Sequence, residues 1–107
     1  MSKTIKQFIP VKESGGISEY RHKKNNLTVL LLENHHAPVI TFMVTYHVGS
    51  RNEAIGHTGS THLLEHLMFK GSKQFNKEGG TAIWNVLQDV GAMINATTWF
   101  DRTNYFE

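Results

Sequence analysis

The spacing of hydrophobic positions along the 107-residue chain predicts strands first, then helices, then strands again. Before residue 50, apolar and β-branched side chains alternate with polar ones or form short apolar runs, a pattern typical of β-strands. The predicted strands cover 17–24, 27–33 and 39–49, and the Asn25–Asn26 pair between the first two favours a hairpin. Residues 1–16 precede them as an N-terminal arm that ends at two glycines.

A helical period replaces this pattern in the second half of the chain. Segment 58–69 carries four apolar residues at helical spacing, and 81–90 carries a similar stripe that ends before Gly91. Glycine fits the left-handed position that ends many helices. Two further strands are predicted at 92–98 and 102–107. This order predicts an α+β fold, with a mainly antiparallel sheet and helices packed on one face.

The composition limits the possible functions. The chain has no cysteine, which excludes a disulfide framework, a thiolate metal site and a cysteine nucleophile. Eleven basic and nine acidic side chains give a net charge of +2, too small to indicate a nucleic-acid partner or an anionic membrane surface. No segment approaches the roughly 20 apolar residues of a membrane-spanning helix. Residues 1–10 contain no apolar signal-peptide core, so we expect no signal peptide and favour a cytoplasmic location.

The chemically informative segment runs from His62 to His66, with Glu65 between them. Helical residues four apart have Cβ atoms about 5–6 Å apart. Two imidazoles with this spacing can bind one zinc ion at about 2.0–2.1 Å each. Glu65 lies on the same side and can accept a proton from a zinc-bound water. Leucines and Met68 fall on the opposite side of the helix, which we expect to pack into the core.

Two histidines and a glutamate with this spacing also occur on solvated helices that have no chemical role. The surroundings favour the metal site, because Gly56 and Gly59 precede the helix and its opposite face is strongly apolar. A purely solvated face would more often carry lysine and glutamate pairs than two histidines.

Two segments together carry a family resemblance. The first, GHTGSTHLLEHLMFKGS, contains H-x-x-E-H, the inverted zinc-peptidase motif. The second begins at Gly91 and follows the pattern G…NA-x-T-x-x-D-x-T-x-Y through Tyr105. In both segments the chain resembles the pitrilysin/insulinase family of peptidases, which includes mitochondrial processing peptidases and bacterial homologues. The resemblance covers about residues 15–107.

The resemblance implies a role for each matched residue. His62 and His66 would bind Zn²⁺, and Glu65 would be the catalytic general base of a zinc metalloendopeptidase. Asn95 and Ala96 would lie on an edge strand that pairs with a peptide or unfolded polypeptide substrate. Without the first motif, Asn95 and Ala96 would be interpreted as part of an ordinary strand with a polar face.

The third zinc ligand of the family is a glutamate, and the resemblance implies that it lies beyond residue 107. Four acidic residues follow the second histidine without occupying the family's position: Glu78, Asp89, Asp101 and Glu107. A catalytic zinc site needs three protein ligands. The segment 17–107 would therefore be the first part of the N-terminal domain of a longer peptidase, within a repeat of the α/β sandwich type. Alone, the chain is expected to be inactive and to self-associate, and its other partners would be the remaining domains of the parent protein.

Two alternatives remain open on the sequence. A non-catalytic subunit of the same family would typically have lost a histidine or the glutamate of the helix, and here all three are intact. A zinc-dependent lyase of the S-ribosylhomocysteine type carries a similar helix, but its site uses cysteines. It would also leave the segment from Asn95 to Tyr105 unexplained.

Overall fold

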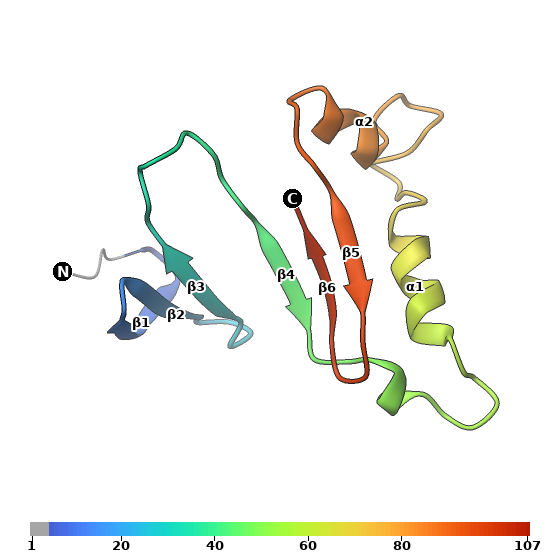
Figure 1. Cartoon of the computed structure of the whole chain (residues 1–107), viewed down its shortest axis with the longest axis horizontal. Coiled ribbons are helices and arrows are strands. Elements are labelled where there is room, and N and C mark those ends of the chain that lie inside the picture. The colour runs from blue at the N-terminus through green and yellow to red at the C-terminus, as the bar shows by residue number, and fades with distance from the viewer. Residues whose placement is uncertain (1–4) are drawn as a thin grey trace. The chain divides into compact units, whose positions relative to one another are not determined.

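A computed structural model describes residues 5–107 of the chain. It contains two compact units, which divide between Val39 and Ile40. Each unit holds its own three-stranded antiparallel sheet (Figure 1). The predicted antiparallel α+β architecture is confirmed, but the strands form two sheets where the hydrophobic pattern predicted one. None of the helices in the described part of the chain is long and apolar enough to cross a membrane.

The first unit is a meander of β1 (Phe8–Ser14), β2 (Ile17–His22) and β3 (Thr28–Leu32). Asn26, with φ of 57°, lies in the turn between β2 and β3, where the Asn25–Asn26 pair predicted a hairpin. Strand β1 lies within the segment that was expected to be an arm. The register of its pairing with β2 shifts between Pro10 and Lys12. Proline cannot donate to a ladder and is tolerated at a sheet edge, which is the position of β1.

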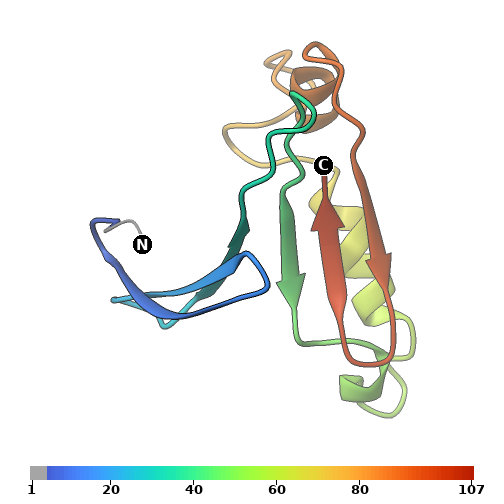
Figure 2. The same cartoon turned by 60° about the vertical axis from the view of Figure 1, so that its left-hand side comes forward.

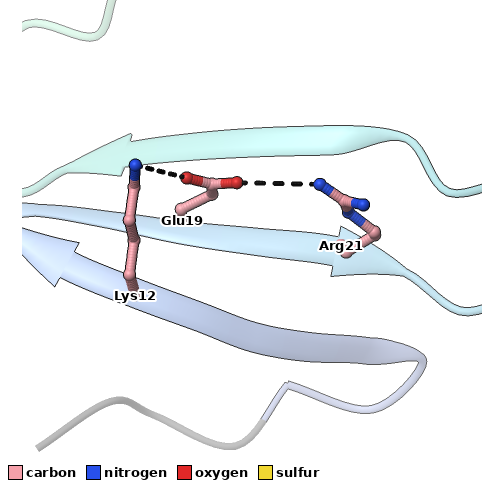
Figure 3. Close-up of polar contacts among 3 residues, drawn as sticks. All are labelled: Lys12, Glu19 and Arg21. Carbon is pink, nitrogen blue, oxygen red and sulfur yellow. Dashed lines mark ion pairs between the residues drawn. The ribbon is translucent and has the colours of Figure 1, made fainter.

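A small group of charged side chains links β1 and β2 on one face of this sheet (Figure 3). Lys12 Nζ lies 3.4 Å from one carboxylate oxygen of Glu19, and an Arg21 nitrogen lies 3.9 Å from the other. Lys12 and Arg21 are largely exposed, so these ion pairs contribute at most about 1 kcal/mol each. The main buried side chain of the unit is Tyr20, which is 3% exposed.

The second unit pairs β4 (Met43–Tyr46), β5 (Asn95–Thr98) and β6 (Thr103–Phe106) in the order β4-β6-β5. The strand that comes last in the sequence is therefore central, and β5 lies at an edge. Strand β4 is shorter than the strand predicted at 39–49. Its four residues are those that pair with β6.

Two helices and a short 3-10 turn, η1 (Ser50–Asn52), complete this unit. Figures 1 and 2 both place α1 (Ser60–Met68) alongside β5. Helix α2 (Ile83–Gln88) is shorter than its predicted range. Gly91 has φ of 75°, and the amides of Gly91 and Ala92 donate to the carbonyls of Gln88 and Leu87. These are the two bonds of a Schellman motif, so Gly91 takes the left-handed position that the sequence predicted for it, although the helix itself ends at Gln88.

The side of α1 that packs against the sheet is the reverse of the predicted one. Glu65 is 8% exposed, whereas the apolar stripe is half exposed. This stripe consists of Leu63, Leu64, Leu67 and Met68. The sheet opposite α1 offers a small residue, buried Ala96, and a hydroxyl on Thr98. A carboxylate fits such a surface because the hydroxyl supplies a hydrogen bond, which leucine cannot use.

Candidate functional site

His62 and His66 lie side by side on the exposed surface of α1. Their Nε2 atoms are 3.1 Å apart, and their ring centroids are 4.7 Å apart. Both histidines are exposed. The helix alone brings them together, because residues four apart in a helix are neighbours. The two imidazoles therefore lie as close together as their spacing in the sequence predicted, and a metal ion bound between them stays a prediction.

Glu65 points from α1 toward β5. The Thr98 hydroxyl donates a hydrogen bond to Glu65 Oε2. This contact joins residues 33 positions apart in the chain. Because Glu65 is buried and its carboxylate is held by β5, the side chain has a fixed orientation beside the two imidazoles.

Tyr105 on the central strand β6 lies close enough to Glu65 for the charge of this carboxylate to act on its phenol. Its Cα partner in the sheet is Ala96, and its ring lies 6.0 Å from that of Phe69 at the end of α1. Burial raises the pKa of the Tyr105 phenol, and the negative charge of Glu65 raises it further. The phenol therefore stays protonated near Glu65 at neutral pH.

The N-terminus of α1 is fixed by a residue that the sequence analysis did not single out. Glu53 accepts hydrogen bonds from the backbone N–H groups of Gly59 and Thr61, at 2.8 and 2.9 Å. Gly59 is the N-cap and has φ of 87°. The hydrogen bonds from the Thr61 and Gly59 backbones lower the pKa of Glu53. A carboxylate is favoured there by the free N–H groups of the helix end.

Asn95 and Ala96 lie at the edge of the sheet, as the resemblance implied. The Ala96 N–H donates to Asn95 Oδ1 at 2.9 Å. This bond is a local one, within two consecutive residues of β5. Ala96 is 8% exposed and faces α1, whereas Asn95 is exposed.

An open cleft of about 540 Å³ lies between these elements. Its lining includes His62 and Glu65 from α1, Glu53 before the helix, Ala96 from β5, and the turn that follows β5. His66 is not part of this lining. Within residues 5–107 no group of three histidine, aspartate or glutamate side chains is gathered around one point.

Comparison with known proteins identifies the family of this chain. Residues 28–107 match the family described as insulinase, peptidase family M16. The chain belongs to this family. The match includes α1, β5 and β6, and therefore every residue of the site described above.

The similar proteins include a zinc protease, a processing-peptidase subunit and a subunit of the cytochrome b-c1 complex. A zinc protease, PqqE of Helicobacter pylori, is 45% identical over 85 residues, which are 78% of this chain and 18% of that protein. The probable mitochondrial-processing peptidase subunit beta of Schizosaccharomyces pombe is 36% identical over 83 residues, which are again 78% of this chain and 18% of that protein. Cytochrome b-c1 complex subunit 1 of Rattus norvegicus is 36% identical over 81 residues, covering 76% of this chain and 16% of its own length. The matches thus span less than a fifth of each of these relatives.

Two contacts of the site were missed from the sequence. Thr98 belongs to the second motif, but nothing in its neighbourhood indicates that its hydroxyl binds Glu65. Glu53 lies six residues before Gly59, and only the loop conformation brings its carboxylate back to the helix end. An acidic residue shortly before a glycine N-cap is a usable signal for such a cap, although a weak one.

Proposed function

We propose that this chain carries two zinc ligands and the general base of a zinc metalloendopeptidase. The observation that carries the proposal is the 3.1 Å separation of the His62 and His66 Nε2 atoms. Two nitrogens bound tetrahedrally to one zinc ion at about 2.0–2.1 Å would be roughly 3.3 Å apart. The imidazoles therefore fit the ion with little movement. The name of the Helicobacter pylori relative, a zinc protease, supports this metal.

The residues of this chain would divide the work of peptide hydrolysis between them. His62 and His66 hold the metal, which, when bound, supplies Lewis acidity and makes a water molecule easier to deprotonate. Glu65 takes up the proton of the attacking water and later delivers it to the leaving amine. Thr98 keeps the Glu65 carboxylate oriented for this transfer. Buried Ala96 lets the peptide and the helix approach each other closely.

Substrate capture would use the edge of β5. An extended peptide adds a strand to an exposed sheet edge by main-chain hydrogen bonds. The Ala96 N–H, which now donates to Asn95 Oδ1, would be released to a carbonyl of the peptide when the Asn95 side chain turns away. The Asn95 amide would then be available to bind the peptide backbone.

The third zinc ligand would come from outside this chain, from a glutamate in the remainder of a longer peptidase. The relatives are several times longer than the matched segment, so they have room for that ligand and for the rest of an α/β sandwich repeat. With two of three protein ligands, the isolated chain should bind zinc weakly and should not hydrolyse peptides.

A non-catalytic subunit is the second candidate, favoured by one relative that is named as a subunit of the cytochrome b-c1 complex. The intact His62, Glu65 and His66 favour the peptidase. The family assignment leaves the lyase alternative without support.

A chimera distinguishes these candidates. Residues 28–107 would replace the matching segment of the Helicobacter pylori zinc protease, and zinc content and hydrolysis of an unfolded protein substrate would be measured. We expect a zinc-containing, active chimera whose activity is lost on Glu65→Gln. A folded chimera that binds zinc without hydrolysing any substrate would favour the non-catalytic subunit.

A further inference from the structure

The turn between β5 and β6 presents two large aromatic side chains to the same cleft as the catalytic helix. Trp99 and Phe100 line the cleft together with His62 and Glu65. Their rings pack edge to face, with centroids 5.4 Å apart and an interplanar angle of 74°. Trp99 is 59% exposed and Phe100 is 63% exposed, so both cleft-lining rings retain free apolar surface.

The backbone that carries these rings is held in place by three hydrogen bonds. The Ser50 and Arg51 amides of η1 donate to the carbonyls of Trp99 and Phe100, at 3.0 and 2.9 Å, and the Trp99 amide donates to the Arg102 carbonyl at 2.8 Å. Gly49 makes this close approach possible. A Cβ atom added to Gly49 would clash with the Trp99 carbonyl oxygen. Aromatic rings on a fixed backbone lose little conformational entropy when they bind a ligand, which favours recognition.

The turn places the two rings close to Glu65, the proposed general base. Trp99 directly follows Thr98, which binds the Glu65 carboxylate. One residue of strand spans about 3.3 Å. A peptide that extends along β5 past Glu65 therefore reaches Trp99 and Phe100 within one or two residues.

The charged residues of the cleft lining restrict which types of peptide side chain would bind there. The charged side chains of its lining are the carboxylates Glu53 and Glu65, and no lysine or arginine is among the described lining residues. The lowered pKa of Glu53 keeps that group ionised at neutral pH. The described lining therefore offers an acidic side chain no basic partner, whereas apolar side chains gain from burial against the aromatic surface.

We propose that Trp99 and Phe100 form an apolar subsite that receives a large apolar side chain of a peptide, one or two residues from the scissile bond. This inference rests on the proposed function, because it assumes that the cleft binds peptides. It goes beyond that function by assigning a substrate preference to two residues of the turn.

Peptide binding to the 107-residue chain tests the subsite. Fluorescein-labelled peptides of one sequence, varied at a single position as Ala, Leu, Phe, Lys or Glu, would be titrated by fluorescence anisotropy in the presence of zinc. We expect the Leu and Phe peptides to bind about tenfold more tightly than the Ala and Glu peptides. The double variant Trp99→Ala/Phe100→Ala should lose this preference. The matched control is Phe42→Ala, because Phe42 is 57% exposed and is not part of the cleft lining; it should keep the preference.

A second measurement applies if the double variant does not fold. The chain has two tryptophans, so Trp84→Phe leaves Trp99 as the only one. We expect the emission of Trp99 to shift to shorter wavelength when the Leu peptide binds, and not when the Ala peptide is added at the same concentration. Equal affinity for all five peptides, or a preference for Lys, would overturn the subsite while leaving the proposed function in place. A chain that binds none of the peptides would overturn the peptide capture on which both depend.

Discussion

The hydroxyl of Thr98, on an edge strand, donates a hydrogen bond to the carboxylate of Glu65, on the neighbouring helix. This contact ties the candidate general base to the strand on which the substrate would pair. It predicts that Thr98 is a positioning residue. Thr98→Val keeps the shape of the side chain and removes the donor. A hydrogen bond to a charged group is worth about 1.5–3 kcal/mol, so we expect kcat of the chimera to fall roughly 10–100-fold with little change in KM.

The conservative variant separates positioning from folding. Thr98→Ser retains the hydroxyl and should recover most of the lost kcat, whereas Thr98→Val should not. Equal kcat for the Val and Ser variants would remove the role assigned to this hydrogen bond.

Glu65→Gln should separate catalysis from metal binding. The amide keeps the size of the side chain but cannot take up a proton, so hydrolysis by the chimera should fall by at least about 10²–10⁴-fold. Zinc content, measured by atomic absorption, should be unchanged because Glu65 is not a proposed ligand. His62→Ala and His66→Ala should each lose zinc and activity together. Loss of zinc from the Gln variant would instead make Glu65 a ligand.

The constellation on α1 was predictable because it is local. His62, Glu65 and His66 lie within one and a half turns, and the period of the helix fixes their relative directions. The side of α1 that packs against the sheet was not predictable from this period. The pattern favoured the leucine side, whereas the structure buries Glu65, because Thr98 supplies a partner from 33 residues away.

The order of the strands in the sheet was also not predictable from local sequence. The strand character of 102–107 was visible in the sequence, but its central place between β4 and β5 depends on pairing with residues about 60 positions earlier. Strand β1 was missed because Pro10 interrupts its pattern, and only its position at a sheet edge makes that proline acceptable.

The carboxylate of Glu53 predicts an acid-sensitive helix end. Its pKa lies below the usual 4.5 because the amides of Gly59 and Thr61 bond the charged form. A lowered folded-state pKa gives a stabilisation that is complete above the unfolded-state value and is lost as pH falls through the folded-state value. In a proton–nitrogen NMR titration, the Gly59 and Thr61 amides should shift with a common midpoint below 4.5. Both shifts should vanish in Glu53→Gln, and a midpoint above 4.5 would contradict the cap.

Because the peptide is proposed to bind at the edge of β5, a substitution there should weaken peptide binding without weakening zinc binding. Ala96→Pro eliminates the N–H that donates to Asn95 and places a ring at the sheet edge. We expect peptide affinity to fall more than tenfold, while zinc affinity, set by His62 and His66 on α1, changes less than twofold. Thr45→Pro, on β4 of the same sheet, is a matched control for the general effect of proline in a short strand. Unchanged peptide affinity in a folded Ala96→Pro variant would place the substrate elsewhere.

The exposed apolar stripe of α1 predicts self-association of the 107-residue chain. Leu64 and Leu67 are 53% and 50% exposed, and they lie within a stripe of four such residues on one helix. Contiguous apolar surface of this kind is typical of interaction sites in soluble proteins. Size-exclusion chromatography with light scattering should therefore show a dimer or larger species.

The double variant Leu64→Lys/Leu67→Lys should shift the population to monomer, because burying two ammonium groups in the contact is unfavourable. Gln88→Lys, which adds a charge on α2 outside the stripe, should leave the association unchanged. At about 100 μM, a dimer with a Kd near that value would form in a substantial fraction of the chains. If the wild-type chain is still monomeric at this concentration, the stripe does not bind a second copy.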